Sequence, residues 1–189
     1  PRPLGDMLRE DFTHIKKVCR VEDKNAVLKN GDKVFHESVR FSDPEFLDML
    51  TFPLKWGVKQ SLAEPNNIIL SDEMATKYFG DENPLGQDIQ MIFGEDRSKT
   101  FKVSGVAEPF PEAHIIDFSF LVNFENLRTN FPNYNSQDWG EFVNATLIQV
   151  SDPSDLALIT EGMTKYQTLH NKAQNDWEIT SFGFEQLAG

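Results

Sequence analysis

The residues that could do chemistry are four histidines and one mixed group of carboxylates. The histidines are His14, His36, His114 and His170, and none is spaced from another as in the HxxxH or HExxH metal motifs. The mixed group consists of Glu108, Glu112, His114 and Asp117. Carboxylates beside a histidine can bind a divalent metal or transfer protons. A secreted or periplasmic hydrolase, or a metal-binding protein, with its site in this group is therefore one alternative.

Motifs of the common enzyme classes are missing from the rest of the chain. The sequence has no CxxC, no GxSxG, no GxxxxGK[ST] and no GxGxxG. Asp43, Asp72 and Asp152 each stand where a helix is expected to begin, so they are interpreted as helix caps. We therefore predict no catalytic residues, no metal and no cofactor.

The charge and cysteine content of the chain disfavour some kinds of binding partner and exclude an internal disulfide. A formal net charge of −12 disfavours binding to nucleic acid and to anionic lipid, both of which attract basic surfaces. The single cysteine, Cys19, cannot form an internal disulfide and is expected to be a small packed residue. No apolar run approaches the roughly 18 residues that span a bilayer. The chain begins at Pro1 without a methionine, so we expect it to be an excised part of a longer protein.

The elements that must position these residues are clearest in the stretch from Ile68 to Pro111. It predicts a short buried strand, a helix capped by Ser71 and ended by Gly80, a Pro-Leu-Gly turn, and a hairpin. Gly105, inside the second hairpin strand, predicts a bulge or a close backbone approach.

The flanking segments predict further helices and strands. Apolar spacing predicts a helix over Pro3–Lys17, and Asn30-Gly31 predicts a tight turn between two strands. The remaining predictions are strands at Val18–Leu28, Val34–Phe41, Ile115–Val122, Phe142–Val150 and Trp177–Phe182, and helices after Pro44, over Asn123–Phe131 and after Pro153. The fold class is α+β, and the chain ends on a strand–helix–strand pattern that resembles its beginning.

Most of the aromatic side chains are expected in the core, with a minority beside loops. Because loops vary while the scaffold holds, we predict partner contacts there. The candidate contact residues are Phe110, Glu112, His114, Phe131 and Tyr134.

Four blocks of the sequence, in order, resemble the periplasmic core domain of MacB/FtsX-like ABC transporter permeases, in the version typical of Bacteroidetes. The blocks are VRFSDPEFLDMLTFPLKWG (39–57), IILSDEMATKYFGDENPLGQDI (68–89), FKVSGVAEPFPEAHIIDFSFLVNF (101–124) and WGEFVNATLIQVSDPSDLALITEGM (139–163). Each block alone is modest, but their order and spacing match across nearly the whole chain.

The resemblance implies a discontinuous porter-like α/β subdomain, residues 1–60 and 141–189, made of two β-α-β-type halves. A mixed α/β Sabre-like subdomain, residues 61–140, is inserted between them. It further implies a location at the periplasmic face of the bacterial inner membrane. There the domain would couple ATP hydrolysis in the cytoplasm to conformational work.

The same resemblance implies partners and excludes catalysis in this chain. The implied partners are a separate cytoplasmic ABC ATPase subunit, a second permease copy, and a periplasmic adaptor, peptide, lipoprotein or cell-wall enzyme. Movement would enter through the first helix and the C-terminal end near Leu187, so both ends are expected on one side. A static interaction module is the remaining alternative.

Overall fold

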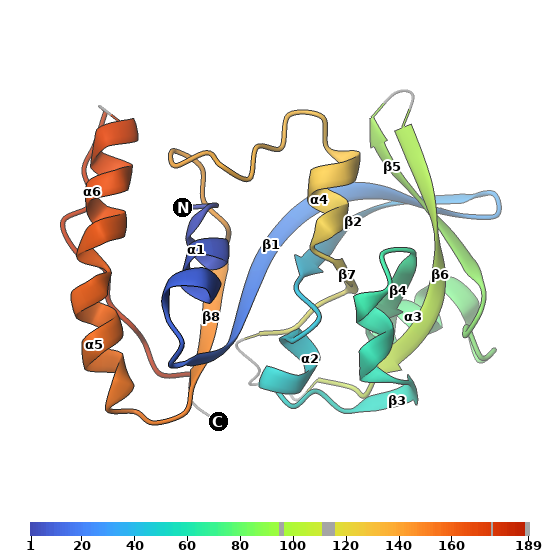
Figure 1. Cartoon of the computed structure of the whole chain (residues 1–189). Coiled ribbons are helices and arrows are strands. Elements are labelled where there is room, and N and C mark those ends of the chain that lie inside the picture. Colours follow the sequence, from blue (N-terminus) through green and yellow to red (C-terminus); the bar gives the residue numbers. More distant parts are fainter. Residues whose placement is uncertain (95–96, 111–115, 175, 188–189) are drawn as a thin grey trace. The chain divides into compact units, whose positions relative to one another are not determined.

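The chain divides into two compact units. A computed structural model describes residues 1–94, 97–110, 116–174 and 176–187 (Figure 1). Unit 1 combines Pro1–Val18 with Asn135–Gly189, and unit 2 is Cys19–Tyr134. The mixture of helices and strands confirms the α+β class at this coarse level.

The strands of unit 2 join into a closed ring. They are β1 (Ile15–Asn30, of which residues 19–30 belong here), β2 (Lys33–Ser42), β3 (Leu54–Gly57), β4 (Asn67–Leu70), β5 (Asp88–Gly94), β6 (Arg97–Ala107) and β7 (Phe120–Asn123). Hydrogen bonding runs in the order β2-β7-β4-β6-β5-β1, and β1 also pairs with β2. The closing contact places Leu28 of β1 opposite Phe35 of β2 and opposite Met91 of β5. β3 lies off the ring and pairs with the end of β6.

The core of unit 2 includes side chains from these ring strands together with side chains from the helical segments of the unit. Completely buried examples are Leu28, Val39, Phe41, Ile68, Met91 and Phe101. Burial of this apolar surface is the main favourable contribution to folding. Cys19 is also fully buried, which confirms the prediction that it is a packed residue.

The turns and caps of unit 2 agree with the local sequence signals. The β1–β2 turn contains Gly31 at a φ of 57°, as the Asn-Gly pair predicts. α3 (Asp72–Phe79) begins with the Met74 N–H donating to the Ser71 hydroxyl at 3.1 Å and ends at Gly80. The predicted cap and helix stop are therefore confirmed.

Gly105 occupies the irregular position predicted for it. The pairing of β4 with β6 shifts by one residue between Ile68 and Ile69, opposite Val103 and Gly105. A Cβ atom on Gly105 would lie 3.3 Å from the Trp56 carbonyl oxygen, so β3 approaches closely here. Both the bulge and the close approach are present.

Three short helical segments complete unit 2. They are α2 (Phe46–Met49), the 3-10 helix η1 (Lys59–Ala63) and α4 (Glu125–Asn130). The residue preceding α2 is Glu45, and no side chain caps the helix. The prediction that Asp43 caps it is wrong, because the Asp43 carboxylate is bound to Arg20 instead.

Unit 1 packs helices from both ends of the chain around one apolar cluster. Its elements are α1 (Leu4–Asp11), β8 (Ala145–Val150), α5 (Asp155–Gly162) and α6 (Thr164–Ala173), and β8 is hydrogen-bonded to β1. The buried cluster consists of Leu4, Leu8, Val18, Ile159, Met163 and Tyr166. The predicted helix over Pro3–Lys17 is therefore too long, because the chain leaves the helix at Phe12 and enters β1 at Ile15.

The predicted strand over Trp177–Phe182 is not a strand. Its backbone finds partners in the side-chain amides of α6 and not in a neighbouring strand. Asn171 accepts from the Ile179 N–H at 2.9 Å and donates to the Ile179 carbonyl at 3.1 Å, and Gln167 donates to the Thr180 carbonyl at 2.9 Å. Within the described residues, the strand–helix–strand pattern of the N-terminal segments is therefore not repeated at the C-terminal end.

Three further predicted elements are also shorter in the structure. The strand predicted at Ile115–Val122 appears as β7, which begins at Phe120, and residue 115 lies outside the described part. The predicted helix Asn123–Phe131 is α4, and the strand Phe142–Val150 begins only at Ala145. Both chain ends belong to unit 1, while the last two residues lie outside the described ranges, so their predicted common side stays a prediction.

Candidate functional site

The group proposed for metal or acid–base chemistry is only partly described. Glu112 and His114 lie outside the described residues. Glu108, just after β6, and Asp117, shortly before β7, are both exposed. Among the residues that the structure describes, no three His, Cys, Asp or Glu side chains are placed to hold a metal ion.

The remaining histidines lie on different segments of the chain. His14 is exposed in unit 1 and His36 is exposed on β2 of unit 2. His170 on α6 is completely buried, with Nδ1 2.9 Å from the Trp139 carbonyl oxygen and its ring centroid 4.4 Å from that of Trp177. These contacts show a structural histidine that connects α6 to the loop at Trp139.

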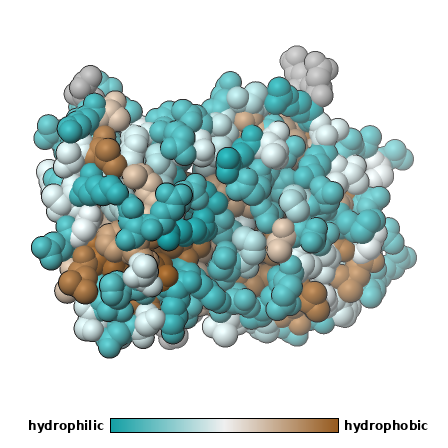
Figure 2. All heavy atoms as spheres, in the orientation of Figure 1, coloured by the Kyte–Doolittle hydropathy of each residue, from teal (hydrophilic) through white to brown (hydrophobic). Residues whose placement is uncertain are grey.

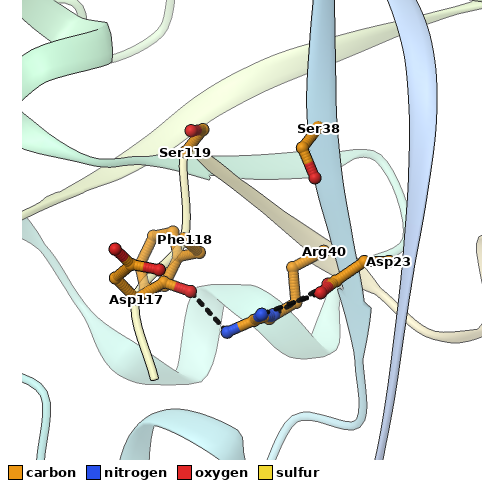
Figure 3. Close-up of a pocket in the computed structure, with 6 residues that line it drawn as sticks. All are labelled: Asp23, Ser38, Arg40, Asp117, Phe118 and Ser119. Atoms are coloured by element: carbon orange, nitrogen blue, oxygen red, sulfur yellow. Dashed lines mark hydrogen bonds and ion pairs between the residues drawn. The ribbon is translucent and has the colours of Figure 1, made fainter. Parts of the chain in front are cut away.

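The described residues form a polar hollow in unit 2 (Figure 3). Its volume is about 240 Å³, and its lining residues are Asp23, Ser38, Arg40, Asp117, Phe118 and Ser119. They come from β1, from β2 and from the segment that leads into β7. Antiparallel pairing places Asp23 directly opposite Arg40, which brings the two charged groups together.

Arg40 is held in place across the floor of this hollow. Its Nε and Nη2 each lie 2.8 Å from an oxygen of Asp23, and Nη1 donates to the Asp117 carbonyl. Such a two-pronged pair fixes the guanidinium plane. In Figure 3, Ser38 and Ser119 lie above Arg40, and the Ser38 side chain points toward the side of Arg40 and Asp23. The described lining has no histidine or cysteine to make a nucleophile–base pair. The described lining offers two carboxylates, a guanidinium and two hydroxyls for polar contact.

The aromatic residues proposed for partner contact pack against core rings. Phe110 lies 5.1 Å from Phe118 between ring centroids, and Phe131 lies 5.7 Å from Phe41. Tyr134 meets Phe124 edge-on at 6.3 Å. Phe110, Phe131 and Tyr134 are each partly exposed, and their contact with a partner stays a prediction.

Two tyrosines, Tyr78 and Tyr166, have strongly raised pKa values. Burial first, and then the Glu37 carboxylate that accepts from the hydroxyl at 3.1 Å, raises the pKa of Tyr78. Burial, followed by the 2.6 Å bond to Asp11, raises the pKa of Tyr166. Both effects stabilise the protonated tyrosine, so these residues serve as hydrogen-bond donors in the fold.

Sequence reasoning missed the buried ion pair of Arg20 with Asp43. The Arg20 side chain is 4% exposed and its Nη2 lies 2.8 Å from Asp43 Oδ1. Asp43 stands beside Pro44, where the local pattern is typical of a helix start, and its true partner is 23 residues earlier. No short-range signal links such residues.

Exposed large apolar side chains occur in both units. Val34, Val58 and Leu85 are exposed in unit 2. Phe142, Leu158, Trp177 and Leu187 are exposed in unit 1, where Leu158 on α5 is 56% exposed. On the face drawn in Figure 2, hydrophobic residues gather over α5. No helix in the described part of the chain is long and apolar enough to cross a membrane.

The fold and the hollow define a mixed α/β domain with a polar recess and no assembled catalytic group among its described residues. The family model of the MacB-like periplasmic core domain matches residues 1–166, and the chain belongs to this family. It is thus the periplasmic domain of a MacB/FtsX-like ABC transporter permease, which lies at the inner membrane. Permeases of this family work with ABC ATPase partners and form dimers. No similar sequence was found among curated proteins.

Solved structures share the fold at low sequence identity. A domain from Porphyromonas gingivalis, described as part of a permease, is 19% identical with a TM-score of 0.68, over 90% of this chain and 73% of that one. The periplasmic region of MacB from Actinobacillus actinomycetemcomitans is 18% identical with a TM-score of 0.63, over 89% and 73%. The extracellular domain of the noncanonic ABC-type transporter YknZ from Gram-positive bacteria is 15% identical with a TM-score of 0.62, over 87% and 81%.

Proposed function

We propose that this domain couples ATP hydrolysis on a separate cytoplasmic subunit to movement that acts on a cargo or partner protein in the periplasm. The supporting observation is the path of β1. This one strand begins in unit 1, which contains both ends of the chain, and continues through unit 2. A displacement that enters at the ends would therefore reach unit 2 along a continuous, hydrogen-bonded strand.

The proposal includes the division implied by the resemblance, with a porter-like subdomain of residues 1–60 and 141–189 around a Sabre-like insertion of residues 61–140. The discontinuous unit 1 supports a first subdomain built from both ends of the chain, with an N-terminal part that ends at Val18 in the structure. The contact surface for the partner would be the hollow at Arg40 with the neighbouring aromatic residue Phe110. Phe110 packs on Phe118, which lines the hollow.

The test uses the intact permease with its ATPase partner, reconstituted in lipid vesicles. Spin labels on Thr76→Cys in α3 and Lys172→Cys in α6, both exposed positions, report the distance between the two units. We expect this distance to change when ATP is hydrolysed and to stay constant with a hydrolysis-deficient ATPase. Identical distances in every nucleotide state would contradict the proposal and would favour a static interaction module.

A further inference from the structure

The chain passes between the two units twice, and both passages reach one buried cluster in unit 2. The first passage lies between Val18 and Cys19, inside β1, and the second lies between Tyr134 and Asn135. The two positions are far apart in sequence. Within unit 2, however, the residues next to each passage contact the same aromatic ring.

At the first passage, Arg20 is held by Asp43 through three bonds. The Arg20 backbone N–H and its Nε donate to Asp43 Oδ2 at 2.7 and 2.9 Å, and its Nη2 donates to Oδ1 at 2.8 Å. The Asp43 N–H donates to the Arg20 carbonyl at 3.2 Å. Arg20 is 4% exposed and Asp43 is 5% exposed. The carboxylate therefore holds both the backbone and the side chain of the second residue after the passage.

At the second passage, Tyr134 packs on the ring that Arg20 covers. The Arg20 guanidinium carbon lies 4.1 Å from the centroid of the Phe124 ring, within the range of a cation–π contact. The Phe124 and Tyr134 centroids are 6.3 Å apart at an interplanar angle of 80°. One buried phenyl ring thus connects the residues that flank the two passages.

On the unit 1 side of the first passage, the strand is also held by an arginine. Arg9 of α1 donates from Nη2 to the Val18 carbonyl at 2.8 Å. β1 therefore has a side-chain anchor in each unit, immediately before and soon after the passage.

A buried ion pair is a weak means of gaining stability, because removing two charges from water costs about as much as their attraction returns. Well-packed apolar side chains would hold the same space at similar stability. The pair instead fixes the orientation of Arg20 relative to Asp43, because a two-pronged guanidinium–carboxylate contact tolerates little rotation or displacement of either group. The pair is therefore better suited to fixing geometry than to adding stability.

We propose that Arg20, Asp43, Phe124 and Tyr134 form an anchor that fixes the directions in which both chain connections leave unit 2. With the anchor intact, unit 2 follows any displacement of β1 as a single body. The biological meaning of the anchor rests on the proposed function, but its mechanical action can be measured on this chain alone.

The test compares two aspartate variants of the chain that carries Thr76→Cys and Lys172→Cys spin labels. Cys19 is buried and stays unlabelled.

The first variant, Asp43→Asn, weakens the anchor. Asp23→Asn is the matched control, because Asp23 of β1 makes a similarly short two-pronged bond to Arg40 of β2, three residues further from the first passage than Arg20. We expect the distance distribution between labels to broaden in Asp43→Asn relative to the unsubstituted chain and to keep its width in Asp23→Asn. Equal widths of the distance distribution in all three proteins would refute the proposal that this anchor fixes the chain connections.

The double variant Arg20→Met with Asp43→Leu keeps the inference testable if Asp43→Asn folds poorly. The apolar pair fills the site without leaving an unpaired charge, so we expect a folded chain with a broadened distribution. A folded double variant with the original width would show that packing alone fixes the connections, and would refute the role of the ion pair. Because these measurements need no ATPase, their failure is distinguishable from failure of the nucleotide-dependent test on the intact permease.

Discussion

The Asn171 side chain holds the C-terminal segment to α6 through two hydrogen bonds to backbone groups, as a neighbouring strand would. Replacing Asn171 should therefore weaken this attachment by a predictable amount. Its side-chain amide makes one donor and one acceptor bond to the backbone of Ile179, at 3.1 and 2.9 Å. Asn171→Ala removes both bonds. At roughly 1 kcal/mol net for each bond, the segment loses about 2 kcal/mol of local stability. A loss of that size raises the population of the detached segment about 30-fold.

Hydrogen exchange of residues 176–187 measures this loss directly. We expect the Ile179 amide to exchange roughly 30-fold faster in Asn171→Ala, since the side-chain oxygen that accepts from this amide is removed, while amides in the middle of α6 keep their rates. Gln167→Ala is the graded control, because Gln167 makes a single bond to the Thr180 carbonyl. It should accelerate exchange by less than Asn171→Ala. Unchanged exchange of Ile179 in Asn171→Ala would refute the idea that side-chain amides of α6 take the place of a neighbouring strand.

Three further predictions concern stability measured by urea unfolding. Phe41→Ala, in the fully buried core of unit 2, should cost about 3–5 kcal/mol, and a loss below about 1 kcal/mol would contradict its placement. Gly57→Ala should destabilise unit 2 because Gly57 has a φ of 89° and a Cβ there would clash with the Ser104 carbonyl oxygen; Gly94→Ala, with open space around it, is the control. A hydrogen bond from Lys165, and then one from Tyr166, lowers the pKa of Asp11. The stabilisation by Asp11 is therefore present above about pH 4 and is lost as the pH falls below that, so Asp11→Asn should differ from the unsubstituted chain at about pH 7 more than at about pH 3.

Local signals in the sequence correctly predicted where α3 begins and ends and where the chain turns between β1 and β2. Ser71, Gly80 and the Asn30-Gly31 turn act through atoms within a few residues of themselves, so their effects can be inferred from short stretches. The hairpin of β5 and β6 follows from the same kind of signal.

The features that sequence reasoning did not predict all depend on contacts between different segments of the chain. Apolar spacing continues past Asp11, yet the chain becomes extended because β1 finds partners in distant strands. The segment after Trp177 looks like a strand, but its hydrogen-bond partners are side chains. The ion pair of Arg20 and Asp43 and the hollow around Arg40 form only when β1 and β2 are in register. Each of these features depends on which segments meet, and residue spacing does not contain that information.

The closed ring of unit 2 has a mechanical consequence. A force that pulls along β1 is resisted on two sides, because β1 is hydrogen-bonded to β2 on one flank and to β5 on the other. From β2 the load passes through β7 and β4, and from β5 it passes through β6, until the two routes meet where β4 pairs with β6. To shear β1 out of unit 2, both routes must break together, whereas a strand at the edge of an open sheet would need to break only one.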